Sequence, residues 1–141
     1  METALKIKIT IESTIKAPIS KVWKYWTEPV HITKWNNASD DWHTPFAEND
    51  VKTGGNFKFR MEAKDGSFGF DFGGTYDLVV NNELMEYTIG DGRKVKVEFI
   101  ENGNHTQVTE IFEAEDQNSA EMQRNGWQAI LDNFKKYVEA N

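Results

Sequence analysis

Hydrophobic and polar residues alternate along two segments between residues 54 and 76, a pattern typical of β-strands with one apolar face. The apolar positions are Phe57, Phe59 and Met61 in the first segment, and Phe68, Phe70 and Phe72 in the second. An Asp65-Gly66 pair lies between the segments, which favours a tight turn and therefore a β-hairpin. A face built from such large side chains can wall a cavity rather than only fill a core.

The rest of the pattern predicts a strand and two short helices before this hairpin, and a meander of strands around and after it. Leu5, Ile7, Ile9 and Ile11 alternate with polar residues in the first strand, while Val22, Trp23, Trp26, Ile32 and Trp35 have helical spacing. Residues 36–53 are predicted to form a long loop with one extended piece at residues 42–45. Turn-forming pairs then recur at Asp65-Gly66, Asn81-Asn82, Asp91-Gly92 and Asn102-Gly103. The Gly73-Gly74 pair predicts a bulge that lets the sheet bend.

The end of the chain predicts a long amphipathic helix. Its apolar stripe consists of Trp127, Ile130, Leu131, Phe134 and Val138. Asn118 is the predicted N-cap, with Glu121 completing a capping box. A helix of about 20 residues is about 30 Å long, so it can lie across a whole sheet.

These elements and several local segments resemble the START-like superfamily, and within it the bacterial family named after the activator of the heat-shock-protein-90 ATPase. The segments that carry the resemblance are residues 17–23, 26–29, 32–35, 54–57, 73–76 and 125–127, with Leu131 after them. The resemblance covers essentially the whole chain. It implies an α+β helix-grip fold, in which a curved antiparallel sheet of about six or seven strands wraps around the C-terminal helix. We accordingly expect a single domain over residues 1–141.

Members of this superfamily bind lipids, hormones, polyketides or flavonoid-like compounds, and some catalyse cyclisation or aromatic-ring chemistry. The resemblance therefore implies a cavity between the sheet and the C-terminal helix. The family takes its name from co-chaperones that carry such a domain within a larger chain, and a role in the stress response follows from that name. We expect this sequence to contain the one domain alone.

Composition narrows the possible partners. The net charge of −7 argues against nucleic acid, because nucleic-acid binding needs a basic surface. The chain has no cysteine, which excludes disulfides, thiolate chemistry and the usual zinc and iron–sulfur sites. No two histidines share a helix turn. We therefore expect no metal and no cofactor. No segment has the roughly 20 apolar residues of a membrane span, and the N-terminus lacks the apolar block of a signal peptide. A cytoplasmic protein without membrane insertion is the expectation.

The candidate ligand-binding residues are mainly aromatic. Phe59, Phe70, Phe72 and Trp127 are expected to wall the cavity, with Trp35, Trp42 and His43 near its entrance. Ordinary core packing is the alternative explanation for most of these apolar positions, since apolar alternation normally marks a buried face. Both explanations hold at once if the core is incompletely filled.

The opposite face of the hairpin carries Arg60, Glu62 and Asp71. This face is either a solvated surface with cross-strand ion pairs or, if a bulge turns it inward, part of the site. In the second case Arg60 binds a ligand carboxylate or phenolate, and Asp71, Glu62 or His43 acts as acid or base.

Three functions follow from these observations. The favoured one is binding of a small hydrophobic, aromatic or lipid-like molecule in the cavity. The first alternative is a cofactor-independent cyclase, dehydratase or hydrolase acting on such a molecule. The second is a co-chaperone-type module that binds a protein partner through its acidic surface.

Overall fold

The computed structural model describes residues 7–141, which form one antiparallel sheet and three helices. The strands are β1 (Lys8–Ile15), β2 (Trp42–Asn49), β3 (Asn56–Ala63), β4 (Gly69–Val80), β5 (Leu84–Ile89), β6 (Lys94–Asn102) and β7 (His105–Glu113). The helices are α1 (Ile19–Thr27), α2 (Pro29–Trp35) and α3 (Ala120–Ala140).

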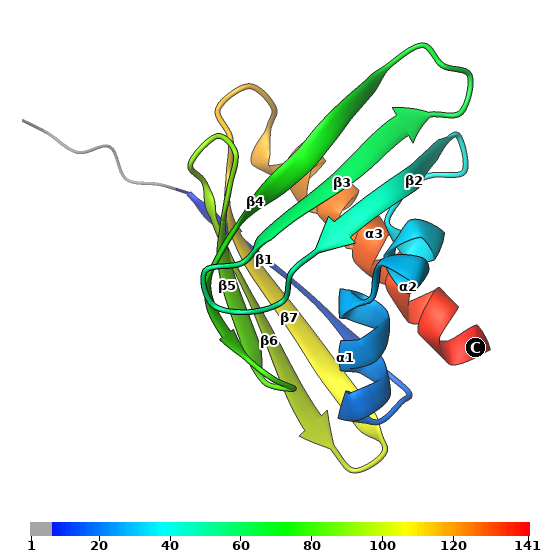
Figure 1. Ribbon diagram of the computed structural model, residues 1–141, viewed down its shortest axis with the longest axis vertical. Helices are drawn as coiled ribbons and strands as arrows, with labels where there is room; N and C mark the ends of the chain where they lie inside the picture. Colours follow the sequence, from blue (N-terminus) through cyan, green and yellow to red (C-terminus); the bar gives the residue numbers. More distant parts are fainter. Residues whose placement is uncertain (1–6) are drawn as a thin grey trace, which may run out of the picture.

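The sheet curls around α3, and the β3–β4 hairpin projects as an arm at one end (Figure 1). Consecutive strands pair from β2 to β7, and β1 pairs with β7, which gives the order β1-β7-β6-β5-β4-β3-β2. The predicted α+β helix-grip fold is confirmed, with seven strands, two short helices after the first strand and a long C-terminal helix. The first strand is found from Lys8 onward, and its predicted start at Leu5 lies outside the described residues.

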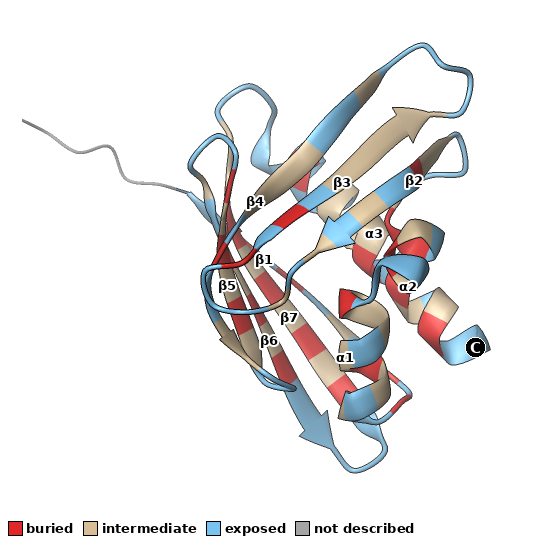
Figure 2. Ribbon diagram, viewed as in Figure 1, coloured by how far each residue is buried: buried red, intermediate tan, exposed pale blue. Residues whose placement is uncertain are grey.

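The core lies between the concave face of the sheet and α3. Val97 and Phe99 of β6 are buried while their neighbours in the strand are not, because successive side chains point to opposite faces. Leu131, Phe134 and Val138 of α3 form the facing apolar stripe. Buried positions concentrate on β5, β6 and β7 and on the helices, whereas the end of the β3–β4 arm is half-buried or exposed (Figure 2).

The predicted bulge at the glycine pair is wrong. Strand β3 pairs with β4 in continuous register across Gly73 and Gly74, and the register shift in β4 lies between Tyr76 and Leu78. The glycines instead allow close backbone approach: a Cβ at Gly74 would lie 2.2 Å from the carbonyl oxygen of Thr88. The curved sheet leaves no room for a side chain there.

The predicted loop over residues 36–53 contains a complete strand, β2, which is longer than the expected extended piece. It forms the edge of the sheet and pairs with β3, with a register shift between His43 and Phe46. Pro45 lies within that shift, where a residue without an N–H group is tolerated. The proline and the irregularity together obscure the strand's period in the sequence.

The predicted N-cap of α3 is wrong by one residue. Ser119 is the cap, and its hydroxyl accepts a hydrogen bond of 3.1 Å from the Met122 N–H. Asn118 and Ser119 are equally good cap types, so their intrinsic preference does not decide between them. The helix is 21 residues long, close to the predicted length.

Candidate functional site

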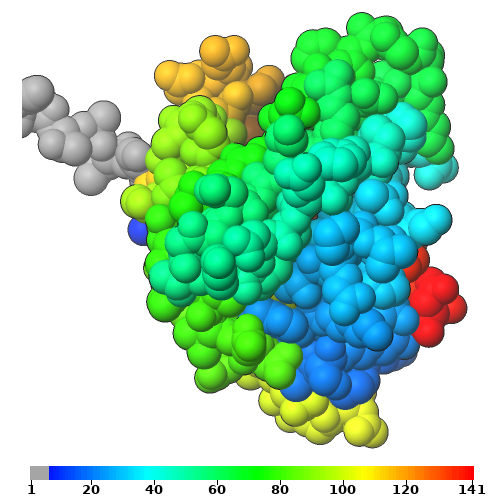
Figure 3. Space-filling view, viewed as in Figure 1, coloured from blue at the N-terminus to red at the C-terminus, as the bar shows by residue number. Residues whose placement is uncertain are grey.

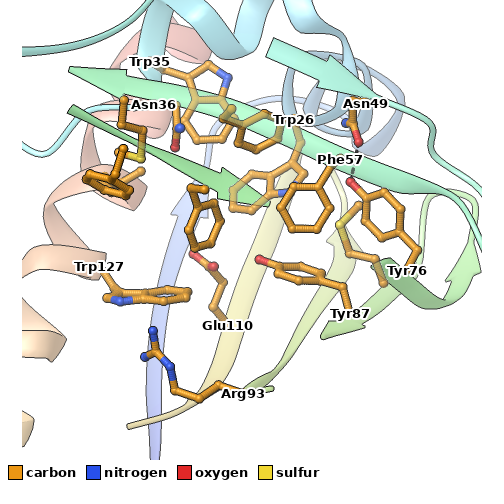
Figure 4. A pocket seen from close by; sticks show the side chains of 16 residues that line it. Trp26, Trp35, Asn36, Asn49, Phe57, Tyr76, Tyr87, Arg93, Glu110 and Trp127 are labelled. Carbon is orange, nitrogen blue, oxygen red and sulfur yellow. Dashed lines mark hydrogen bonds between the residues drawn. The ribbon is translucent and has the colours of Figure 1, made fainter. Parts of the chain in front are cut away.

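A cavity of about 280 Å³ lies between the concave face of the sheet, the two short helices and α3. It is lined by Trp26, Trp35, Asn36, Asn49, Phe57, Phe59, Met61, Phe70, Phe72, Tyr76, Met85, Tyr87, Arg93, Glu110, Trp127 and Ile130 (Figure 4). On one face of the molecule, atoms of β2 and its connection to β3 abut those of the short helices and cover the interior (Figure 3).

The walls are held by contacts between aromatic rings. Trp26 of α1 and Trp35 of α2 lie 5.1 Å apart between ring centroids, and both contact Phe134 edge-on. Trp127 of α3 stacks on Phe112 at 3.9 Å with an interplanar angle of 8°. These rings are therefore fixed by their neighbours, independently of any ligand.

Gly126 lies on α3 beside Trp127, and apart from its chain neighbours and the helix backbone no atom lies within 4 Å of the position a Cβ would occupy. Close packing against the sheet therefore does not explain this glycine. A glycine inside a helix costs about 1 kcal/mol relative to alanine. The space that a side chain at Gly126 would occupy is open here and lies next to the lining residues Trp127 and Ile130.

Most polar groups of the lining are paired. The Tyr76 hydroxyl donates to Asn49 Oδ1 at 2.6 Å, and Asn49 Nδ2 donates to the Thr27 carbonyl at 2.8 Å. Burial raises the pKa of Tyr76, so it remains a hydrogen-bond donor. Asn36 Nδ2 donates to Thr44 Oγ1 at 3.3 Å. These pairs hold β2 and β4 against the short helices.

Glu110 of β7 is, with the Tyr87 hydroxyl of β5, an exception. It is 6% exposed and, among residues 7–141, has neither a hydrogen-bond partner nor an ion-pair partner. Desolvation raises the pKa of its carboxyl to about 8, because removal from water disfavours the charged form. Figure 4 shows this carboxyl turned into the cavity, toward the hydroxyl end of Tyr87. The cavity thus contains one acid that is mainly protonated at neutral pH.

Five of the eight predicted ligand-binding residues line the cavity: Trp35, Phe59, Phe70, Phe72 and Trp127. The other three, Trp42, His43 and Arg60, are not part of its lining. The structure therefore brings together the predicted aromatic wall and places the predicted polar residues elsewhere.

Arg60, Glu62 and Asp71 lie on the outer face of the arm, away from the lining. Arg60 Nε donates to Glu62 Oε2 at 2.9 Å, and Arg60 Nη1 lies 3.5 Å from Asp71 Oδ1. His43 Nε2 lies 3.7 Å from the other Glu62 oxygen. The side chains of Glu62 and Asp71 are 38% and 54% exposed, so solvent screens these pairs. The guanidinium of Arg60 also lies over Gly69, in the space that a side chain at this position would occupy.

Three aromatic side chains, from the arm and from the start of β2, form a patch that continues from the cavity, and we call them the aromatic ledge: Trp42, Phe68 and Phe70. Trp42 lies 6.0 Å from Phe68 and 6.1 Å from Phe70 between ring centroids. Phe68 is 61% exposed and Phe70 is 39% exposed. Because Phe70 also belongs to the lining, the ledge is continuous with the cavity.

Sequence reasoning missed Glu110 and Tyr87. The signal for Glu110 is present in the strand pattern, because Thr106, Val108, Glu110 and Phe112 alternate and all four are buried. An acidic residue in register with buried apolar neighbours is a candidate functional group. Trp26, Asn49 and Arg93 were also missed, since nothing in their local pattern relates them to a cavity.

The part of the chain that the structure describes contains no group of three or more potential metal ligands. Within residues 7–141, no helix is long and apolar enough to cross a membrane.

Comparisons with known proteins identify relatives of this chain. A family profile described as "Activator of Hsp90 ATPase homolog 1-like protein" matches residues 16–139. The solution structure of the AHSA1-like protein from Aeromonas hydrophila is 46% identical, with a TM-score of 0.90, over 95% of this chain and 93% of that chain. A solution structure from Cytophaga hutchinsonii is 57% identical, with a TM-score of 0.83 and the same coverage of 95% and 93%.

A crystal structure from Chromobacterium violaceum is similar in fold alone. It is 21% identical, with a TM-score of 0.82, over 95% of this chain and 98% of that chain. No curated protein matches this chain.

Proposed function

This chain belongs to the family of Activator of Hsp90 ATPase homolog 1-like proteins, and we propose that it binds a small, mainly apolar molecule in the cavity between its sheet and α3. The observation that carries the proposal is the cavity itself, about 280 Å³ of space lined mainly by aromatic side chains. Protein interiors are normally close-packed, so unfilled space of this size needs an explanation. Concave, mainly apolar sites with few polar groups are typical of small-molecule binding.

The size of the cavity limits the ligand. Small-molecule sites usually have volumes of roughly 300–1,000 Å³, so this one is at the small end. It suits a molecule of about two to three six-membered rings. Burial of about 200 Å² of apolar surface would contribute about 5 kcal/mol before the costs of association are subtracted. A longer molecule would continue along the aromatic ledge.

Filling the cavity tests this proposal. We expect Ile130→Trp, which adds an indole to the lining, to weaken binding of the neutral fluorescent probe N-phenyl-1-naphthylamine at least about tenfold. Ile100→Trp is the matched control, because Ile100 is 53% exposed on β6 and is not part of the lining. Equal probe affinity in the two variants, with both folded by circular dichroism, would show that the probe binds elsewhere and contradict the proposal.

Glu110 favours a second candidate function, acid–base catalysis without a cofactor. A carboxyl with a pKa of about 8 can both give and take a proton near neutral pH. The acids and base predicted from the sequence lie outside the cavity, Asp71 and Glu62 on the outer face of the arm and His43 beside them on β2, and would serve only a substrate bound there. For turnover in the cavity, Glu110→Gln should abolish activity while Asp71→Asn leaves it intact. The reverse result would assign the chemistry to the arm.

The third candidate is a protein-binding module, as the family's name suggests for its namesake. The exposed aromatic ledge and the net charge of −7 support it. Salt-dependent stimulation of an Hsp90 ATPase by this chain, lost on Phe68→Ala, is the test. A cytoplasmic location and a stress-related role remain predictions.

A further inference from the structure

The strand register places Glu110 on the inner face of the sheet among apolar residues. Its cross-strand neighbours are Val97 on β6 and Ile11 on β1, which are 0% and 3% exposed. Tyr87 belongs to the adjacent row of the same face, through its pairing with Val95 on β6. Figure 4 shows the Glu110 carboxyl and the Tyr87 hydroxyl turned toward each other at the cavity wall.

Both polar groups lack a protein partner, yet neither is sealed inside the core. No hydrogen bond or ion pair of either side chain is found among residues 7–141. In the same part of the chain, every fully enclosed side-chain nitrogen or oxygen has a hydrogen-bond partner. The polar atoms of Glu110 and Tyr87 must therefore be reached from the cavity, since the two residues are only 6% and 8% exposed. Two polar groups that have no protein partner and face the cavity are free to hydrogen-bond to a molecule bound there.

We infer that Glu110 and Tyr87 are a paired hydrogen-bond donor site for a neutral acceptor oxygen, such as a ketone or ester carbonyl, on an otherwise apolar ligand. The inference rests on the proposed function and specifies its ligand class. A protonated carboxyl and a phenol each supply one O–H donor, and a carbonyl oxygen accepts two. The aromatic walls would bind the rest of the ligand.

The charges around Glu110 favour a neutral ligand. Three other titratable side chains belong to the lining: Tyr76, Tyr87 and Arg93. Tyr76 donates to Asn49, and burial raises the pKa of both tyrosines, which keeps them neutral.

Arg93 is paired elsewhere: its Nε lies 2.8 Å from Asp91 Oδ2, and its Nη1 donates to the Glu113 carbonyl at 3.3 Å. Among residues 7–141, no basic group thus stabilises an ionised Glu110, whose protonated form is a donor.

Three ligands of nearly equal shape distinguish a donor site from a purely apolar site and from a cation site. Benzophenone carries a carbonyl, diphenylmethane has no polar group, and benzhydrylamine is a cation at pH 6.5. Each would displace N-phenyl-1-naphthylamine from the full chain. We expect benzophenone to bind about tenfold more tightly than diphenylmethane, the effect of about one good hydrogen bond. Glu110→Leu should abolish this preference and Tyr87→Phe should reduce it. Glu110→Gln should retain it, because the amide still donates.

Each other result overturns the inference. Equal binding of benzophenone and diphenylmethane would leave the proposed function intact but remove the donor site. Tightest binding of benzhydrylamine would make the site a cation receptor. Failure of the probe and all three compounds to bind would reject the proposed function as well.

The pH dependence provides a test that does not need Glu110→Leu to fold. The preference of the wild type for benzophenone should decline as pH rises through about 8, where the Glu110 carboxyl ionises. In Glu110→Gln the preference should be independent of pH. A flat profile in the folded wild type would overturn the inference.

Discussion

A carboxyl group on the buried inner face of a sheet makes the free energy of unfolding depend on pH. The sign of this dependence is opposite to that for an acid in a salt bridge. The folded-state pKa of Glu110 is raised to about 8 from an ordinary value of 4.5. Below pH 4.5 both states carry the proton. Between these values the unfolded chain releases a proton that the folded chain keeps, so stability falls as pH rises. Above pH 8 the contribution of this group is constant.

We therefore expect Glu110→Gln to gain stability relative to wild type as pH rises from 4.5 to 8, by up to about 1.4 kcal/mol per pH unit. Urea unfolding of both proteins at several pH values between 4.5 and 9 measures this difference. The same substitution at the exposed Glu48 is the control. Parallel profiles of wild type and Glu110→Gln would show that the carboxyl is not desolvated.

Among the elements, β4 shows how glycine gives a sheet its curvature. A Cβ at Gly74 would lie 2.2 Å from the Thr88 carbonyl oxygen and 3.0 Å from the Ile89 Cα, both backbone atoms. Gly90 lies near the same strands, but the nearest atom to its Cβ position is 3.9 Å away. The two glycines therefore have different roles although the sequence does not distinguish them.

Gly74→Ala should destabilise the fold by several kcal/mol, because backbone atoms of β4 and β5 must separate to admit the methyl group. Gly90→Ala should change stability by less than about 1 kcal/mol, since its Cβ meets only an ordinary contact. Thermal unfolding followed by circular dichroism compares the two. Similar melting temperatures for both variants would mean that the sheet relaxes at Gly74 without cost.

At the scale of the whole molecule, strong periodicity made the fold predictable. The aromatic alternation of β3 and β4 and the stripe Leu131–Phe134–Val138 of α3 are local patterns, and both elements were predicted from them. Strand β2 was only partly predicted, because Pro45 and the register shift break its period. The site was less predictable from the sequence, since a cavity depends on the space that side chains from distant elements leave between them. Glu110 is the instructive case: its inward position follows from the strand pattern, but its lack of a partner does not.

The unfilled interior also affects how the protein responds to compression. Unfolding lets water reach space that the folded chain leaves unoccupied, so the unfolded state has the smaller volume, typically by 20–100 mL/mol. The part of the 280 Å³ cavity that is closed to solvent should add to this volume change.

Ile130→Trp should raise the pressure of half-unfolding, measured by tryptophan fluorescence, whereas Ile100→Trp should not. Equal midpoints would indicate that water already occupies the cavity. A ligand that fits should act like the added indole, so hydrostatic pressure offers a way to find the natural ligand: a compound that binds in the cavity raises the pressure needed to unfold the protein.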